Sequence, residues 1–573
     1  MSTVLAPPSP AREGAIAPAE SSLEQTTILR QGPPAPPPKA GGRLESLCLF
    51  LLFAGAYAAI GYQVMIVQHV VVVDALDRLA RAYLVWHDAP PKLAVIGFDL
   101  PPIPTLLLLP VTLVGPVASS LVGLLLWSAA FAGGVIVLLN HLLTRCGMPR
   151  AMRYPALLLF GANPLFAFYA SNGMPDMVYL FFLTGTLYAL LSWVMTRATR
   201  FLVLAGVALS ICALTRYEFI IWALPLTLMV GATLVRRRAQ RSEIEGTTIV
   251  FAVPVCYALA LWSLFSGLIV NKPFGWVGDG SATLAVNSDQ VASSTGASVH
   301  SVIAHLAEVL TTTAPLAIAV LPLLTLVFLG RREETSLWLA GLIALAIAVI
   351  GAGALLAGDV SVLTLNDGLA IGLVAFMGAA WMYRSSNGAS TPVWLITIAL
   401  LAATLPLAWQ SMQSYPFQNE AQAFVRALKT GSDQEGSSSI GGYHVGIAPE
   451  LQMAGFIDRD VLGEHAILTD NAQTYAVILL SGHPQLFFDR VQRGDSVWGA
   501  VARRPYGRVA YMLISTQAKH DLLRELYPSA ASGSDPTFPV LFRTSRYILV
   551  RVPSRAPSAT QPSPPSLAPA PSS

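Results

Sequence analysis

The sequence has 573 residues, of which 54% are hydrophobic and only 12% are charged, and its mean hydropathy is +0.59. These values exclude an ordinary soluble globular domain and are typical of a protein that crosses a membrane several times. The net charge of +3 says little by itself, because the positions of Lys and Arg along a membrane protein matter more than their sum. The four cysteines show no disulfide or metal-ligand spacing.

Both ends of the chain are rich in Pro, Ala and Ser. Such segments cannot bury enough apolar surface to offset the entropy of ordering. We therefore predict a disordered cytoplasmic tail at residues 1–42 and a second disordered tail at residues 553–573. The first apolar run begins only near Leu44, too late for a cleavable signal peptide.

Apolar segments of spanning length occupy much of residues 43–410, which we interpret as the transmembrane module. The first, about Leu44–Val67, is long enough to cross roughly 30 Å of hydrocarbon. Ten more are expected at about 117–144, 155–171, 177–195, 201–215, 219–235, 247–270, 309–329, 336–357, 362–383 and 391–409. The sequence thus predicts a polytopic α-helical protein with about eleven transmembrane helices.

Arginine clusters occur in alternate loops between these segments, at Arg145, Arg150 and Arg153, at Arg197 and Arg200, at Arg236 to Arg241, at Arg331 and Arg332, and at Arg384. Because cytoplasmic loops collect positive charge, we predict that these loops and the N-terminus are cytoplasmic. The first outer loop, 68–116, and everything after about residue 410 then lie outside. A multi-pass plasma (inner) membrane protein is expected.

Residues 411–552 change character and read as a small extracytoplasmic α/β domain. Short β-rich runs are expected at 465–470, 475–482, 484–489, 508–515 and 546–552, with a helix-compatible segment at 516–527. No catalytic triad or metal set is evident by spacing in this domain. We therefore expect it to bind an acceptor or to act as a scaffold.

The first outer loop carries a dense set of charged residues. From Asp74 onward, apolar residues recur at helical spacing while Asp74, Asp77, Arg78 and Arg81 occupy another face. This pattern predicts an amphipathic helix in the membrane interface. A purely structural interpretation is that Asp74 caps the helix and pairs with Arg78 while Asp77 pairs with Arg81, each pair contributing only a few tenths of a kcal/mol.

Four motifs in this order, all on the predicted outer side, resemble those of the GT-C glycosyltransferases. They are DALDRLARAY (74–83), AVIGFDLPPIP (94–104), NP (163–164) with SNGMPD (171–176), and TRYE (215–218). That superfamily includes protein O-mannosyltransferases and aminoarabinose transferases, and the resemblance covers about residues 44–410. It implies a GT-C type fold and transfer of a sugar, with inversion, from a polyprenyl-phosphate donor to an acceptor hydroxyl of a glycan, lipid or protein.

The resemblance also implies site residues. Asp74 matches the position of the catalytic base, with Asp77 as the second catalytic candidate, and Arg216 is placed to meet the donor phosphate. Further donor-phosphate or substrate-binding candidates are Tyr217, Glu218, Arg78, Asp99 and Asp176. Many relatives carry Asp-Glu where this chain has Asp74-Ala75, and Ser-Glu where it has Pro175-Asp176. These differences leave a divalent metal unassigned, and no cofactor is certain.

Structural readings remain open for two of these residues. Arg216 could be a snorkelling interfacial cation paired with Glu218, and Asp176 an ordinary acidic N-cap. The outer loop from Asn271 to Glu308 is expected to be either a lid or a passive connector.

Other functions also remain open. A transporter or lipid flippase should carry ionisable residues near the midpoints of spans; Asp367, with Asn366, in the tenth predicted span is the main support for it. A ligase or polymerase of lipid-linked polysaccharide should place Arg and His in a large outer loop late in the chain. A non-catalytic membrane scaffold would need no catalytic site.

Overall fold

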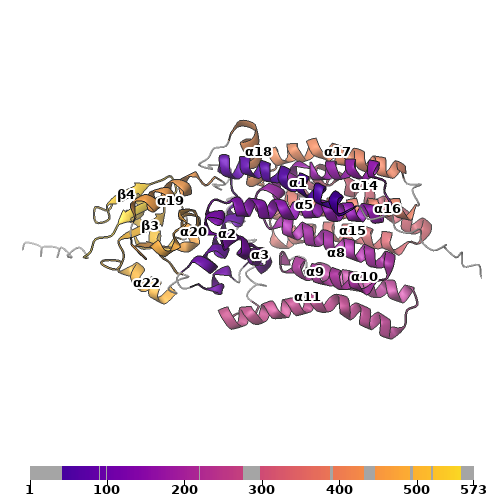
Figure 1. The fold of residues 1–573 in the computed structure, drawn as a ribbon, viewed down its shortest axis with the longest axis horizontal. Coiled ribbons are helices and arrows are strands. Elements are labelled where there is room, and N and C mark those ends of the chain that lie inside the picture. Colours follow the sequence, from indigo (N-terminus) through magenta and orange to yellow (C-terminus); the bar gives the residue numbers. More distant parts are fainter. Residues whose placement is uncertain are drawn as a thin grey trace, which may run out of the picture. The chain divides into compact units, whose positions relative to one another are not determined.

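Long apolar helices form most of the computed structural model (Figure 1). The structure describes residues 42–88, 91–97, 100–217, 220–274, 297–386, 391–431, 446–461, 463–490, 495–517 and 521–555. The predicted tails at 1–42 and 553–573 therefore lie almost wholly outside the described residues.

Seven helices in these ranges are long and apolar enough to cross a membrane. They are α1 with its continuation η1 (Arg43–Gly61 and Tyr62–Val67), α5 (Val122–Arg145), α8 (Asp176–Thr196), α11 (Arg241–Val270), α15 (Glu334–Ala357), α16 (Leu365–Ser385) and α17 (Thr391–Ser414). Helices α13 (Val299–Thr313) and α14 (Pro315–Arg331) make an eighth span if the 94° bend between them is counted within one crossing. The chain is a multi-pass α-helical membrane protein, as predicted.

The remaining predicted spans are also helical but are shorter or interrupted. Helix α6 (Arg150–Gly161) is separated from α7 (Pro164–Ser171) at Asn163, whose side chain caps α7 by accepting from the N–H of Leu165 at 2.9 Å. Helix α9 (Thr199–Ala213) has 15 residues and α10 (Ile220–Arg236) has 17. In the packing of the module, α1 lies against α5, α5 against α8, and α8 against α9 (Figure 1).

The predicted first outer loop, residues 68–116, folds as α2 (Val73–His87), η2 (Leu93–Ile96), α3 (Pro102–Thr112) and α4 (Gly115–Ser119). The amphipathic pattern after Asp74 is therefore a helix, and its residues Leu76, Leu79 and Tyr83 are buried. This apolar face packs against α3 and against α20 of the C-terminal domain. Protein therefore covers much of the face that the sequence predicts to lie in the membrane interface.

The C-terminal domain contains a five-stranded sheet in the order β2-β1-β3-β5-β4. Its strands are β1 (Ile467–Thr469), β2 (Phe487–Phe488), β3 (Tyr511–Ser515), β4 (Val540–Arg543) and β5 (Tyr547–Arg551). β1 pairs in parallel with β2 and β3, and β5 pairs antiparallel with β3 and β4. The accompanying helices are α19 (Ala448–Asp460), α20 (Asn471–Ser481), η5 (Pro484–Leu486), α22 (Asp495–Arg503), α23 (Leu522–Leu526) and α24 (Pro528–Ser532).

The predicted α/β character of this domain is confirmed, but one strand assignment is wrong. Residues 475–482 lie in and directly after α20, because Asp470 caps that helix by accepting from the N–H of Ala472 at 3.3 Å. An apolar run of eight residues fits a buried helix as well as a strand. Strand β4, which the sequence reading missed, is a short edge strand with mostly exposed side chains.

The domain shares an apolar cluster with the first outer loop. Leu84 and Val85 of α2 lie in the same cluster as Ile467, Leu513 and Leu549 of the sheet. The backbones also meet where the N–H of Ile447 donates to the carbonyl of His69 at 2.9 Å. Two short elements complete the fold. The element η4 (Val360–Val362) connects α15 to α16, and α18 (Asn419–Thr430) follows α17 and packs against α17 and α7. The limits of the domains remain predictions.

Candidate functional site

Helix α2 carries two ion pairs at i,i+4 spacing, as its sequence predicts. Arg78 Nε lies 3.2 Å from the carboxylate of Asp74, and Arg81 Nε lies 2.8 Å from that of Asp77. Helix α2 begins after Val72, and no side chain in the described part of the chain caps it. Asp74 therefore does not cap the helix, and its carboxylate is held by Arg78.

The two pairs differ in their exposure. Arg78 is buried and also donates to the carbonyl of Pro101 at 3.0 Å, so its guanidinium is fixed between α2 and the start of α3. The side chain of Asp74 keeps 37% of its surface exposed, against 20% for Asp77. Asp74 is thus the carboxylate of α2 that is better placed to meet a ligand.

A second acid, Asp176, lies at the first residue of α8 and is 5% exposed. Its Oδ1 accepts a hydrogen bond from Asn366 Nδ2 and lies 3.3 Å from Arg216. The guanidinium of Arg216 is also stacked over the ring of Tyr179, 5.5 Å from its centre. The partners of Asp176 come from α16 and from the loop before α10, so this carboxylate joins three parts of the chain instead of merely capping its own helix.

The turn between α7 and α8 depends on Gly173. Its φ is +76°, which L side chains rarely adopt, and a Cβ there would lie 2.4 Å from Leu124 Cγ. Asn172 closes the same turn, because its Oδ1 accepts from the N–H of Met174 at 3.0 Å. The SNGMPD motif is therefore the tight turn that delivers Asp176 to this end of the helices.

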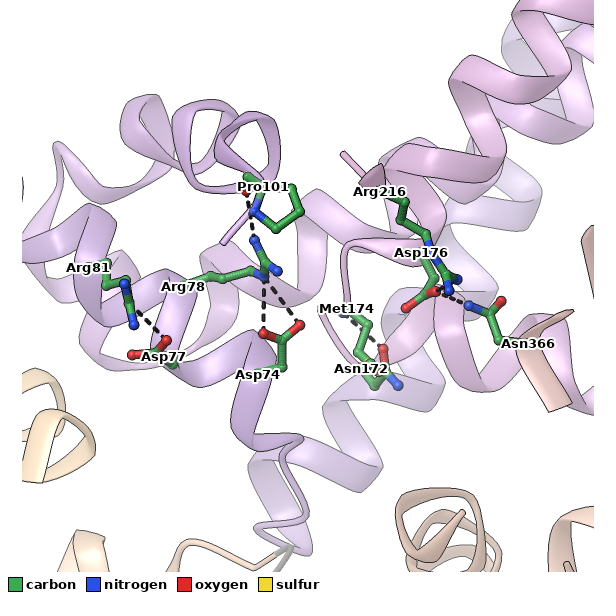
Figure 2. Close-up of polar contacts among 10 residues, drawn as sticks. All are labelled: Asp74, Asp77, Arg78, Arg81, Pro101, Asn172, Met174, Asp176, Arg216 and Asn366. Carbon is green, nitrogen blue, oxygen red and sulfur yellow. Dashed lines mark hydrogen bonds and ion pairs between the residues drawn. The ribbon is translucent and has the colours of Figure 1, made fainter. Parts of the chain in front are cut away.

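The acids of α2 and α8 belong to one site. In Figure 2 the side chain of Asn172 lies between those of Asp74 and Asp176. Asp77 and Arg81 lie farther from Asp176 in the same view. Among the predicted site residues, the structure thus brings together Asp74, Arg78, Asp176 and Arg216. These four residues, with Asn172 and Asn366, are called the Asp176 cluster below.

The other predicted site residues have different surroundings. The hydroxyl of Tyr217 accepts from Trp262 Nε1 at 3.1 Å and donates to the carbonyl of Leu100 at 3.4 Å, which ties α11 to the first outer loop. Asp99 and Glu218 lie outside the described residues, so the predicted pairing of Glu218 with Arg216 also lies outside them.

Asn366 and Asp367 do not lie in the middle of a span. Asp367 accepts from the N–H and the hydroxyl of Thr364, at 3.1 and 3.0 Å, and this reciprocal cap starts α16. Both residues are in the first turn, and Asn366 contributes to the Asp176 cluster. Their predicted mid-span position, the main support for a transporter, is therefore wrong.

Gln418, which the sequence reading missed, fixes the same end of the helices. Its Nε2 donates to the hydroxyl of Tyr169 in α7, and its Oε1 accepts from the N–H of Leu365 at 3.2 Å. No local pattern identifies such a residue, because its partners are distant in sequence.

Among the described residues, no group of three or more His, Cys, Asp or Glu side chains is arranged to hold a metal ion. Of the predicted lid, the structure describes only its two ends, with α13 starting at Val299. A pocket in the C-terminal domain is lined by Thr516, Arg524, Glu525, Pro528, Ala531, Ser532 and Arg543. It contains none of the predicted site residues.

Comparison with known proteins found similarity only at the level of structure, since neither a family model nor a curated protein sequence matches the chain. Two crystal structures of ArnT from Cupriavidus metallidurans match over 89% of this chain. The structure bound to undecaprenyl phosphate is 15% identical in sequence, with 98% of its own chain covered and a TM-score of 0.48. The apo structure is 13% identical, with 99% of its own chain covered and a TM-score of 0.49. A crystal structure of the Archaeoglobus fulgidus oligosaccharyltransferase with a tethered acceptor peptide matches over 86% of this chain and 71% of its own, with 11% identity and a TM-score of 0.44.

The matched proteins are GT-C glycosyltransferases, the superfamily that the sequence motifs resemble.

Proposed function

We propose that this protein is a membrane glycosyltransferase that moves a sugar from a polyprenyl-phosphate donor to an acceptor hydroxyl at the outer face, with inversion at the anomeric carbon. The observation that carries the proposal is the Asp176 cluster, in which two carboxylates and two guanidinium groups from α2, α8 and the loop before α10 share one end of the helices. The motif resemblance supplies the donor class.

The proposed chemistry assigns a separate task to each end of the cluster. Asp74 takes the proton from the acceptor hydroxyl as its oxygen attacks the anomeric carbon, and the bond from that carbon to the phosphate oxygen breaks. The leaving lipid phosphate carries an additional negative charge, which a neighbouring guanidinium stabilises. Arg216 suits this task because its side chain is 26% exposed, whereas Arg78 is buried against Pro101.

The proposal includes the predicted orientation, with the N-terminus cytoplasmic and the Asp176 cluster and C-terminal domain outside. Asp77, Tyr217, Glu218 and Asp99 stay as secondary candidates for catalysis or substrate binding. A divalent metal would need the carboxylates of Asp74 and Asp176, and no step above requires one. We expect the C-terminal domain to hold the acceptor or position α2, since α20 packs on that helix.

The test is product formation by the full-length protein in proteoliposomes supplied with a panel of undecaprenyl-phosphate monosaccharides and crude envelope acceptors. Wild type should release undecaprenyl phosphate, and Asp74→Asn should lower the rate by about 100-fold or more, the typical contribution of a general base. Asp458→Asn is the matched control, because Asp458 is a half-exposed carboxylate that pairs with His483 in the C-terminal domain.

Full activity in Asp74→Asn would remove Asp74 from the mechanism. If wild type turned over none of the donors, the result would contradict the proposed glycosyltransferase activity. It would favour a transporter, a lipid flippase or a non-catalytic scaffold.

A further inference from the structure

The C-terminal domain contains a pocket that the proposed function does not use. It encloses about 540 Å³, which is within the usual size range of small-molecule sites. Its lining includes Thr516, which directly follows β3, and Arg543, the last residue of β4. Both strands pair antiparallel with β5, so they run in the same direction and these two residues lie at the same edge of the sheet. Ligands of open α/β sheets commonly bind outside the carboxyl ends of strands.

Hydrogen bonds hold the walls of this pocket, which is called the Arg543 pocket below. The buried carboxylate of Asp521 accepts from the N–H of Ser515 at 2.7 Å and from the N–H of Arg524 at 3.1 Å, which fixes the start of α23 to the end of β3. Arg543 Nη1 donates to the carbonyl of Ser532 at 3.2 Å, which joins β4 to the end of α24. These bonds hold two strands and two helices around the pocket.

Two arginines and one glutamate line the Arg543 pocket. Arg543 and Glu525 are exposed and Arg524 is half-buried, so a ligand can reach all three side chains. A guanidinium carries five N–H groups, and those of Arg543 other than the donor to Ser532 have no partner in the described part of the chain. The arginines outnumber the glutamate, and their donors suit the oxygens of a phosphate or a carboxylate.

The lining also offers hydrogen-bond acceptors. The hydroxyl of Thr516 donates to the carbonyl of Ser545 at 3.4 Å, so its oxygen acts as an acceptor toward a ligand, and the carboxylate of Glu525 only accepts. A bare phosphate would leave these acceptors without a donor, and Glu525 would repel it. A ligand with hydroxyl groups beside its anionic group satisfies the donors and the acceptors together. The apolar residues of the lining, Pro528 and Ala531, are small and offer little surface to a large apolar side chain.

We propose that the Arg543 pocket binds an anionic sugar, a ring with hydroxyl groups and one phosphate or carboxylate group. Arg543 and Arg524 meet the anionic group, and Thr516 and Glu525 accept from the hydroxyl groups. This assignment gives the C-terminal domain a ligand site of its own.

The Arg543 pocket is separate from the Asp176 cluster. Successive residues of a strand point to opposite faces of a sheet. Met512 of β3 lies in one apolar cluster with Leu523 of α23, whereas Leu513 lies in another with Leu84 of α2. Helix α23 therefore covers the face of the sheet that is turned away from α2. The inference goes beyond the proposed function and does not depend on glycosyl transfer.

Isothermal titration calorimetry of the full-length protein in detergent micelles tests the proposal. The anionic sugars are glucosyl phosphate and glucuronate, and the comparison ligands are glucose, inorganic phosphate and acetyl-alanyl-alanine. Wild type should bind at least one anionic sugar saturably and more tightly than every comparison ligand. Arg543→Gln should weaken this binding by about tenfold to hundredfold, because charge-assisted hydrogen bonds to the anionic group are lost.

Three further variants make the result specific. Arg524→Gln should weaken binding to a similar extent, and it keeps the test decisive if Arg543→Gln fails to fold, since Arg543 also joins β4 to α24. Arg551→Gln is the matched control, because Arg551 is an exposed arginine at the carboxyl end of β5, at the opposite edge of the sheet. This control and Arg216→Ala, at the Asp176 cluster, should bind the anionic sugar as wild type does.

Two results would overturn the inference and leave the proposed function standing: wild type binds neither anionic sugar, or both pocket variants bind it unchanged. Equal affinity for glucose or for inorganic phosphate would overturn the assignment to an anionic sugar, and tighter binding of the dipeptide would assign the pocket to a peptide carboxylate instead. Weakened binding in Arg216→Ala but not in Arg543→Gln would place the sugar at the Asp176 cluster and also overturn the inference. Failure of the transfer assay above would leave this binding result unaffected.

Discussion

Two charge clusters lie at opposite ends of α1. The Glu45 cluster consists of Glu45, Asn140, Arg150 and Arg153; Glu45 belongs to the first turn of α1. The Asp176 cluster is near the other end of α1. The last residue of α1, Gly61, packs so closely against Ser171, the neighbour of Asn172, that a Cβ at Gly61 would lie 2.6 Å from the carbonyl oxygen of Ser171.

The clusters differ in how their acids are used. In the Glu45 cluster one carboxylate, 11% exposed, accepts from two arginines and an asparagine. The Asp176 cluster contains two carboxylates, and Asp74 remains 37% exposed while it is paired with one arginine, Arg78, among the described residues. We conclude that the Glu45 cluster ties α1, α5 and α6 together. The partial exposure of Asp74 in the Asp176 cluster is compatible with its proposed role as the base.

The largest expected effect on stability comes from Arg153→Met. Arg153 is buried, and it donates both to Glu45 and to Thr144. Removing one partner of a buried ion pair typically costs about 3–5 kcal/mol. Because Arg150 and Asn140 still contact Glu45, we expect a loss of about 3 kcal/mol in the free energy of unfolding, with transfer activity per folded molecule unchanged.

Thermal unfolding in detergent and the transfer assay check this prediction. Arg150→Met is the control, since that arginine is 68% exposed. Water screens its pair with Glu45, so this variant should lower the melting temperature far less than Arg153→Met. Lost activity in Arg153→Met at an unchanged melting temperature would contradict the structural role of the Glu45 cluster.

Arg216→Ala tests the opposite end. The variant leaves Asp176 with Asn366 and removes the cation proposed to meet the donor phosphate. Because a charge-assisted hydrogen bond is worth about 1.5–3 kcal/mol, we expect KM for the lipid donor to rise roughly tenfold to hundredfold. Arg241→Ala changes an arginine that is 92% exposed and should leave KM unaltered. An unchanged donor KM in Arg216→Ala would return Arg216 to a structural role.

Local features of both the fold and the site could be predicted from the sequence. Spans follow from long apolar runs, and the pairing of Asp74 with Arg78 follows from helical spacing. The start of α16 could also have been read from Thr364 and Asp367, which are three residues apart as in a capping box. The apolar residues on both sides of this pair favoured a span that begins at residue 362 instead.

The assembly of the Asp176 cluster could not be predicted in the same way. Asp176, Arg216 and Asn366 come from distant parts of the chain, and no periodicity relates them. Predicting this cluster requires knowledge of how the helices pack. If the predicted start of α16 is wrong by one helical turn, Asn366 is placed within the span instead of in the cluster.

The smallest effect is expected from Tyr83→Phe, which tests whether the Asp176 cluster depends on the C-terminal domain. The hydroxyl of Tyr83 in α2 donates to the carbonyl of Gly482 at 3.0 Å, and burial raises the pKa of this hydroxyl, so it remains protonated at neutral pH. Losing one such hydrogen bond should cost about 1 kcal/mol. Tyr57→Phe on α1 loses a similar bond, to the carbonyl of Gly161 at 2.9 Å, and should destabilise the protein equally. Only Tyr83→Phe should also lower the transfer rate, because α2 carries Asp74; equal rates in the two variants would show that the site tolerates a looser contact with the C-terminal domain.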